Sequence, residues 1–453
     1  MTAIYLARWV LPITSAAIEY GAVAIQDATI AAVGGASEVT ARFPDSHILD
    51  FGNSVILPGL VNAHSHLELT VMRGFLEREE RDFSAWLKKL TRARLAMTPE
   101  DLFTSAMCGA TEAARAGVTC FGDSCSSAAE SMKALRRMGL RGIIYQESFG
   151  PDPALAHENM ANLTEQIAAL REQETSLVRA GVSPHAPYTV SPPQLELIAQ
   201  LALNENLPVM MHTAESESER LFMFAGAGPF ADGLRARGIE WQAPGISTVQ
   251  HLQQRGILET KPLLAHCVTV DDRDIDLIGQ SGASIAHCPR SNAKLGHGRA
   301  PFAKFLGANL KVGIGSDSVA SNNNCDILHE ARFAALLSRV SEPGQARAIE
   351  ASATQVLYAA TLGGARALSL DDRIGSLAEG MQADLIAVGL DGAHQQPAGD
   401  PVDALVFSSS GTDVRLTMVA GQEIFRDGKL SATDESELPA RLNEVRSRIN
   451  GVG

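Results

Sequence analysis

The strongest constraint on the fold is a repeated unit in which a short apolar run ends in a polar residue and is followed by a helix-like segment. The stretches between the runs, such as residues 100–117 and 192–206, space their apolar residues three and four positions apart, as helices do. Eight buried strands alternating with helices predict an α/β fold, the (β/α)8 TIM barrel. An open, doubly wound parallel sheet would produce the same alternation and stays as the alternative. The eight runs are residues 55–66, 118–123, 142–148, 180–187, 208–215, 262–267, 284–292 and 311–318.

The polar residues that end these runs favour the barrel. A buried strand rarely carries such groups, but the C-terminal ends of all barrel strands meet at one mouth, where this fold places its chemistry. Eight polar strand ends therefore predict a pocket. The residues are His64 and His66, Asp123, Glu147, His185, His212 with Glu215, His266, His287 with Asn292, and Asp317.

The outer segments predict a second, smaller domain. Residues 1–54 and 373–430 are short β-type runs separated by Gly, Asn or Asp turns, which indicates a small β-sandwich domain formed by both chain ends. In this interpretation residues 55–372 form the barrel and residues 431–453 form a C-terminal helical tail.

Composition limits the partners. The formal net charge of -14 and the absence of a Lys/Arg run argue against nucleic acid or a membrane surface, so a small-molecule ligand is expected. We find no signal peptide and no apolar window long enough to span a membrane. The six cysteines contain no CxxC pair, which favours a reducing, cytoplasmic location.

The first run ends in two histidines that a strand would point to the same side, because residues i and i+2 share a face. Paired imidazoles suit zinc and similar ions, although HxH alone is equally consistent with a structural pair. With His212 and Asp317, His64 and His66 would bind one metal and leave an open position for water, as catalytic sites do. An ion there lowers the pKa of a bound water to roughly 7.

Two further residues suit a hydrolytic reaction. Glu215 follows His212 by three positions and could act as a general acid and base; a solvated loop residue in ESESER is the alternative. His266 could hydrogen-bond the attacking water or stabilise developing negative charge on oxygen; the alternative is a core histidine bonded to a backbone carbonyl.

Six motifs, in this order and spacing, resemble the amidohydrolase superfamily and its cytosine-deaminase-like branch, which removes amino groups from heterocycles. The resemblance implies that His64, His66, His212 and Asp317 bind one divalent metal, Zn2+, with Fe2+ or Mn2+ as alternatives. It also implies that Asp317 and Glu215 move protons, that His266 assists the water, that His185 contacts the substrate, and that ammonia leaves. The motifs are LPGLVNAHSH, SPHAPYTVSP, MMHTAESESE, LLAHCV, AHCPRSNAKLGHG and GIGSDSVASNN.

The sequence predicts the substrate less closely than it predicts the metal site. Relatives that deaminate S-adenosylhomocysteine or methylthioadenosine carry a ribose-binding glutamate after the tryptophan matching Trp86, and carboxylate-binding arginines after the third strand. Residues 87–97 contain no acidic side chain and residues 142–157 contain no arginine. HSHLELT, DFSAWL and AESESER instead resemble the branch that includes aminodeoxyfutalosine deaminases, so aminodeoxyfutalosine is the expected substrate.

Several alternatives stay open. They are a deaminase of S-adenosylhomocysteine, methylthioadenosine, guanine or cytosine, a triazine chlorohydrolase-like enzyme, and a non-catalytic scaffold on the same barrel. We expect Glu68, Trp86 and Glu147 to bind the substrate, with Phe83 and Tyr145 as weaker candidates. By analogy with the resembled family, a homodimer is expected.

Overall fold

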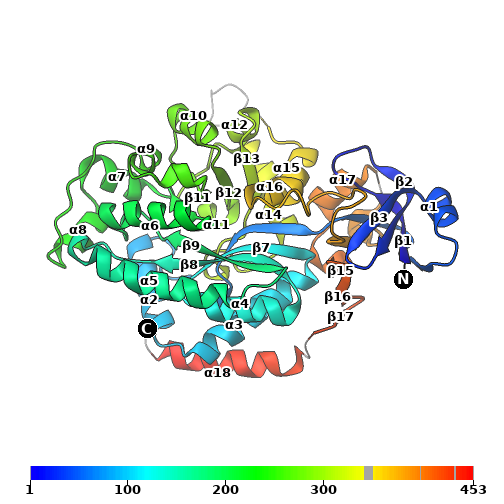
Figure 1. The fold of residues 1–453 in the computed structure, drawn as a ribbon, viewed down its shortest axis with the longest axis horizontal. Helices are drawn as coiled ribbons and strands as arrows, with labels where there is room; N and C mark the ends of the chain where they lie inside the picture. Colours follow the sequence, from blue (N-terminus) through cyan, green and yellow to red (C-terminus); the bar gives the residue numbers. More distant parts are fainter. Residues whose placement is uncertain (1, 341–349, 398, 433–434, 452–453) are drawn as a thin grey trace.

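The computed structural model describes residues 2–340, 350–397, 399–432 and 435–451. Two parts lie side by side in Figure 1: a barrel of strands surrounded by helices, and a sheet built from both chain ends (blue and red). Among the described residues, no helix combines the length and apolar character that crossing a membrane would take.

The barrel consists of two four-stranded parallel sheets, with strand orders β6-β7-β8-β9 and β10-β11-β12-β13. Isolated parallel bridges between Val182 and Val209 and between Ser65 and Asp317 join the two sheets at both seams. The predicted TIM barrel is therefore confirmed, and the open sheet is wrong. Its strands are β6 (Leu60–Ser65), β7 (Val118–Cys125), β8 (Arg141–Ser148), β9 (Val178–Pro184), β10 (Met210–Thr213), β11 (Leu263–His266), β12 (Ser284–His287) and β13 (Lys311–Ile314).

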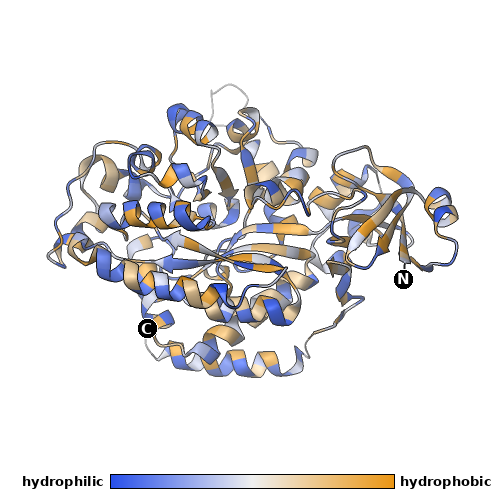
Figure 2. Ribbon diagram, viewed as in Figure 1, coloured by the Kyte–Doolittle hydropathy of each residue, from blue (hydrophilic) through white to orange (hydrophobic). Residues whose placement is uncertain are grey.

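Helices cover the outside of the barrel, and local sequence signals fix their ends. Thr98 begins α3 (Pro99–Arg115) with a capping box to Asp101 and a proline in the first turn. Gly139, in the left-handed conformation with φ 72°, ends α4 (Ala128–Met138). In Figure 2 the helices alternate blue and orange along their length, as amphipathic helices do. The other barrel helices include α5 (Ala156–Arg171), α6 (Pro192–Glu205), α10 (Asp272–Ser281), α12 (Phe302–Gly307), α14 (Ile327–Ser338), α15 (Ala353–Ala360) and α16 (Leu362–Ala367).

Both chain ends contribute to one nine-stranded sheet of order β17-β16-β15-β14-β5-β1-β2-β3, with β4 paired to β1. Apolar residues from the two ends, among them Val23, Ile56, Leu385 and Met418, pack into one buried cluster. The strands are β1 (Thr2–Val10), β2 (Ile18–Gln26), β3 (Thr29–Gly35), β4 (His47–Asp50), β5 (Ser54–Pro58), β14 (Leu385–Gly389), β15 (Val414–Val419), β16 (Gln422–Arg426) and β17 (Lys429–Leu430); α1 (Ala36–Arg42) and α17 (Pro401–Asp403) accompany them.

The first apolar run is not one barrel strand as predicted, because it divides at Gly59. Residues before the glycine form β5 of the terminal sheet, and residues after it form β6 of the barrel. A Cβ added to Gly59 would lie 2.1 Å from Oγ1 of Thr119, so only glycine fits where the chain crosses between the two parts.

The C-terminal segment contains α18 (Leu438–Asn450), which lies along α3 at the lower side of Figure 1. Its residues Val445 and Ile449 are buried in an apolar cluster with Met72 and Trp86. The predicted polar helix therefore also has an apolar side that packs against the barrel.

Candidate metal centre and active site

His64, His66, His212 and Asp317 lie together at the C-terminal mouth of the barrel. One ligand atom from each falls within 4.8 Å of all the others, and all four side chains are buried. Oδ1 of Asp317 is 3.3 Å from Nε2 of His64 and 3.4 Å from Nε2 of His66. His64 lies in β6 and His66 directly after it, His212 lies in β10, and Asp317 lies in the segment after β13. The structure thus brings together the four predicted ligands.

The donor set fits a divalent cation. Nδ1 of His212 lies 2.9 Å from the carbonyl oxygen of His185, which can only accept, so Nδ1 carries the proton. Burial lowers the pKa of His64 to about 4 and holds the pKa of His212 well below its usual value, so both rings stay neutral. Nε2 of His212 therefore presents a lone pair only 3.2 Å from Nε2 of His66, and Nε2 of His64 is buried without a hydrogen-bond partner. A cation between these nitrogens satisfies all of them, and the set is a divalent metal site.

Asp317 is held by its own neighbours. Its Oδ2 accepts hydrogen bonds from Ser291 and, at 2.9 Å, from Ser321, while its backbone N–H donates to the carbonyl of His64 at 2.9 Å. Burial opposes ionisation, but the adjacent imidazoles, that of His64 first, outweigh it and hold the pKa of Asp317 well below its usual range. One carboxylate oxygen is thus used for positioning, and the other faces the histidines.

The backbone is strained at several positions around the mouth. Ala214, His266 and Asp317 have φ of 51°, 74° and 57°, in the left-handed region that non-glycine residues seldom adopt. Such conformations cost of order 1–3 kcal/mol each and persist only where surrounding contacts enforce them. These turns direct the side chains at the strand ends into the mouth.

Glu215 is a buried carboxylate rather than the solvated loop residue that its charged neighbours suggested. Its Oε1 lies 3.3 Å from Nε2 of His297 and 3.7 Å from Nε2 of His266. Burial raises the pKa of Glu215, but His266 and then His297 more than compensate, so the pKa is lowered overall. Sequence reasoning assigned no role to His297, although it lies within the quoted motif AHCPRSNAKLGHG.

The loop that carries Glu215 is held by another glutamate from the same motif. Glu219, in α7 (Glu217–Ala225), is fully buried and accepts hydrogen bonds from the backbone N–H groups of Ala214 at 2.7 Å and Glu215 at 2.9 Å. It also accepts one from Oγ1 of Thr248, at 2.6 Å. Burial raises the pKa of Glu219 to about 7. The run ESESER therefore combines one residue directed into the mouth with one that positions it.

His266 ends β11 with one ring nitrogen fixed and the other unpaired. Nδ1 lies 2.9 Å from Oδ1 of Asn292, an amide oxygen that accepts, so Nδ1 donates. Nε2 is buried without a hydrogen-bond partner and faces the space beside Glu215. The alternative of a histidine satisfied by a backbone carbonyl is not what the structure shows.

The remaining predicted substrate residues surround one cavity of about 760 Å³ above the metal ligands. His185 and Glu147 lie with His212 in a second cluster of possible ligand atoms. Glu147 accepts from Oγ of Ser126 at 2.8 Å, and His185 bonds Oγ1 of Thr189 at 2.9 Å.

Glu68 does not lie on a continued strand, because β6 ends at Ser65 and a 3-10 helix (Leu67–Met72) follows. Its two carboxylate oxygens accept from the backbone N–H groups of Ser126 at 3.0 Å and Ser127 at 2.9 Å. Burial raises the pKa of Glu68 to about 7, and Arg94 is among the groups that oppose this rise. Glu68 still lines the cavity, with both oxygens already engaged.

Aromatic side chains form the walls of the cavity. Phe83 and Trp86 belong to α2 (Phe83–Leu95) and stack with centroids 5.9 Å apart, and Tyr188 stacks on Phe230 at 3.7 Å. The indole N–H of Trp86 is buried and has no acceptor among the described residues. These walls suit a flat, apolar ring.

Asp123, His287 and Tyr145 were predicted or considered as mouth residues but do not line this cavity. Asp123 is buried behind it, where its Oδ1 accepts from Oγ of Ser65 at 2.7 Å. His287 stacks on Phe302 at 4.6 Å and lines a separate small cavity, and Tyr145 packs in the barrel interior. A polar residue at a strand end therefore does not by itself mark the mouth, since it can also fix the neighbouring strand or face a helix.

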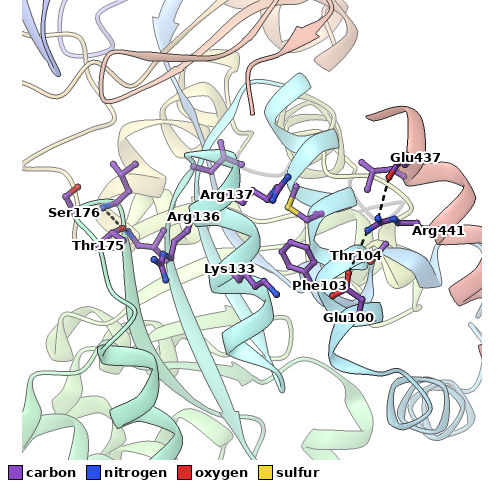
Figure 3. A pocket seen from close by; sticks show the side chains of 15 residues that line it. Glu100, Phe103, Thr104, Lys133, Arg136, Arg137, Thr175, Ser176, Glu437 and Arg441 are labelled. Carbon is purple, nitrogen blue, oxygen red and sulfur yellow. Dashed lines mark hydrogen bonds and ion pairs between the residues drawn. The ribbon is translucent and has the colours of Figure 1, made fainter. Parts of the chain in front are cut away.

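A larger cleft, of about 1110 Å³, lies at the other end of the strands, beside the starts of β8 and β9. Figure 3 shows it between α4, which carries Lys133, Arg136 and Arg137, and α18, whose Arg441 is joined to Glu437 and Glu100. No cluster of possible metal ligands among the described residues lies there. The candidate site is therefore identified by its cluster of possible metal ligands and not by the volume of its cavity.

Comparisons with known proteins agree with this geometry. A sequence profile described as the amidohydrolase family matches residues 55–424, and one described as a bacterial imidazolonepropionase-like composite domain matches residues 21–45. Proteins named 5-methylthioadenosine/S-adenosylhomocysteine deaminase from Syntrophobacter fumaroxidans and Nitratidesulfovibrio vulgaris are 33% and 34% identical over 432 and 436 residues. Each alignment covers 95% of this chain and 93% of the relative.

Solved structures show the same architecture. An adenosine deaminase from Xanthomonas campestris with bound zinc superposes with a TM-score of 0.86 at 28% identity, covering 99% of this chain and 98% of that one. An atrazine chlorohydrolase from Arthrobacter aurescens, at 24% identity and a TM-score of 0.84 over 98% of this chain and 100% of its own, supports the fold alone. Relatives and fold together identify a hydrolase that acts on carbon–nitrogen bonds. The chain belongs to the amidohydrolase family.

Proposed function

We propose that the protein is a metal-dependent aminohydrolase that releases ammonia from an adenine nucleoside modified at its 5′ position. The observation that carries this proposal is one mouth in which four buried ligands, a buried glutamate and an unpaired histidine nitrogen face the same cavity. The names of the curated relatives support the adenine nucleoside class. Aminodeoxyfutalosine, methylthioadenosine and S-adenosylhomocysteine all belong to it.

His64, His66, His212 and Asp317 would hold the ion, which we propose to be zinc because imidazole nitrogens and one carboxylate form the donor set. When bound, the ion supplies a Lewis acid that makes water a better nucleophile at neutral pH. Oδ2 of Asp317 stays with Ser291 and Ser321, so Oδ1 is the oxygen that faces the ligands and the attacking water.

Glu215 and His266 act on the substrate in this proposal. Glu215 is ionised near neutral pH, since its pKa is lowered, so it can take a proton from water and deliver it to a ring nitrogen. His266 donates through Nδ1 to Asn292, so Nε2, which has no partner among the described residues, is left to hydrogen-bond and orient the water. His185 and Glu147 contact the ring or its substituents, and Phe83 and Trp86 exclude solvent from its face.

A cytoplasmic location and a homodimer are parts of the same proposal. The six cysteines are all free thiols, and five are buried, which agrees with a reducing compartment.

The test measures ammonia release by zinc-loaded protein from methylthioadenosine, S-adenosylhomocysteine, adenosine, aminodeoxyfutalosine, guanine and cytosine. We expect turnover of at least one 5′-modified adenosine and a loss of turnover in Glu215→Gln with bound zinc retained. Chloride release from a chlorotriazine without ammonia release would instead support a chlorohydrolase. Tight zinc binding with no turnover of any compound would support the scaffold alternative.

A further inference from the structure

The cavity has cationic residues at its entrance that the reaction itself does not use. Lys88, Arg92 and Arg94 come from α2, and Arg237 follows α8 (Pro229–Arg235). Within the described parts of the chain, none of these four side chains makes a hydrogen bond or an ion pair. Lys89, the neighbour of Lys88, does not line the cavity and pairs with Glu79 at 3.1 Å.

Arg94 lies on the side of α2 that faces the cavity. Phe83, Leu87, Leu90 and Arg94 follow the helical spacing of three and four, and all of them line the cavity. Arg94 is half-buried, whereas Lys88, Arg92 and Arg237 are exposed. A guanidinium that is partly removed from water and has no acceptor is costly, so a ligand that supplies one binds favourably there.

Glu68 and Glu147 attract Arg94 electrostatically, but among the described residues neither carboxylate accepts a hydrogen bond from it. The oxygens of Glu68 are engaged by the backbone of Ser126 and Ser127, and those of Glu147 by the hydroxyl groups of Ser124 and Ser126. The C-terminal end of α2 attracts the charges of its last turn, Arg92 and Arg94, but this effect is small at partly exposed positions and does not reach Lys88 in the middle of the helix.

We propose that the entrance of the cavity binds an anionic group of the substrate, a carboxylate or a phosphate, with Arg94 as the direct contact and Lys88, Arg92 and Arg237 adding attraction. A guanidinium matches either group with two parallel hydrogen bonds. This inference rests on the proposed function and names its substrate class as an adenine nucleoside with a negatively charged 5′ substituent. The charges come from α2 and from the segment after α8, since residues 142–157 contain no arginine.

The test compares three adenine compounds with zinc-loaded, full-length protein: methylthioadenosine, whose 5′ substituent is uncharged, S-adenosylhomocysteine, which adds a carboxylate, and adenosine 5′-monophosphate, which adds a phosphate. We expect the wild type to have a higher kcat/KM for one of the anionic compounds than for methylthioadenosine. Arg94→Gln should lower kcat/KM for that compound by about 10- to 100-fold, chiefly through KM, because a charged hydrogen bond is lost. Methylthioadenosine should lose far less kcat/KM than that compound, because it has no anionic group for Arg94 to bind, and Arg94→Lys should restore part of the loss for the anion. The anion that loses more in Arg94→Gln identifies the group that is bound.

Arg136→Gln is the matched control, because it removes the same charge from the distant cleft of Figure 3 and should change none of the three values. An equal loss for all three compounds in Arg94→Gln, or no loss, would overturn the inference while leaving the deaminase proposal standing if methylthioadenosine is turned over. Absence of turnover for every adenine compound by the wild type would instead remove the proposed function.

Discussion

Replacement of Glu219 by alanine tests whether this residue positions Glu215. The substitution leaves two buried backbone N–H groups, those of Ala214 and Glu215, without the acceptor that now lies 2.7 and 2.9 Å away. These groups cannot rotate towards water, and each unsatisfied donor costs about 1–3 kcal/mol, so we expect the free energy of unfolding to fall by about 2–6 kcal/mol. Ala214 also loses a contact that enforces its φ of 51°. Displacement of Glu215 by about 1 Å should then lower kcat about 100-fold.

Urea unfolding of the zinc-loaded protein and steady-state ammonia release measure the two effects. Glu217→Gln is the matched control, because Glu217 lies in the same helix but is exposed, and among the described residues it pairs only with Arg220, at 2.7 Å. It should change the free energy of unfolding by no more than about 1 kcal/mol and leave kcat unaltered. A Glu219→Ala protein with the urea midpoint and kcat of the wild type would refute the reasoning.

Three further predictions concern the metal, the pH dependence and the contact between the two parts of the fold. Asp317→Asn should weaken zinc binding by more than the roughly 10- to 100-fold that loss of an outer contact causes, measured as zinc retained after dialysis; full retention would contradict the ligand assignment. His297→Phe removes one of the groups that lower the pKa of Glu215. Because Glu215 must be ionised to accept a proton, the acid limb of the pH profile of kcat/KM should move to higher pH. An acid limb at the wild-type pH would contradict the role of Glu215 as proton acceptor. Arg141→Met leaves the buried Asp384 without its charge partner, the guanidinium that now lies 2.8 Å away. This should lower the free energy of unfolding in urea by about 3–5 kcal/mol. An unchanged urea midpoint would show that the pair contributes nothing to stability.

The barrel and the candidate metal ligands could be predicted from local patterns in the sequence. Each strand carries its own apolar run, and the i, i+2 spacing of His64 and His66 at the end of β6 predicts that they share a face. His212 and Asp317 could be placed near them because parallel barrel strands must end at the same mouth. These inferences need no knowledge of side-chain contacts, and that is why they could be made in advance.

The contacts made by particular side chains depend on three-dimensional packing. His287 ends a strand as His266 does, but it stacks on Phe302 while His266 faces the cavity. Glu219 looks like a surface charge in the sequence, yet the backbone turn at Ala214 gives it two buried donors. Spacing alone carries no signal for these choices. Arg94 could have been noticed as the continuation of an apolar helical stripe.

The division of the chain at Gly59 also affects the order in which parts of the fold can form during synthesis. The strand β5, which leads into the candidate metal ligands His64 and His66, pairs with β1 through only two residues but with β14 along all five of its own. Most of its hydrogen-bonded partners are therefore absent until Leu385–Gly389 has left the ribosome. A nascent or shortened chain that stops before Leu385 contains all four candidate ligands. However, β5, the strand before His64 and His66, then lacks its pairing with β14.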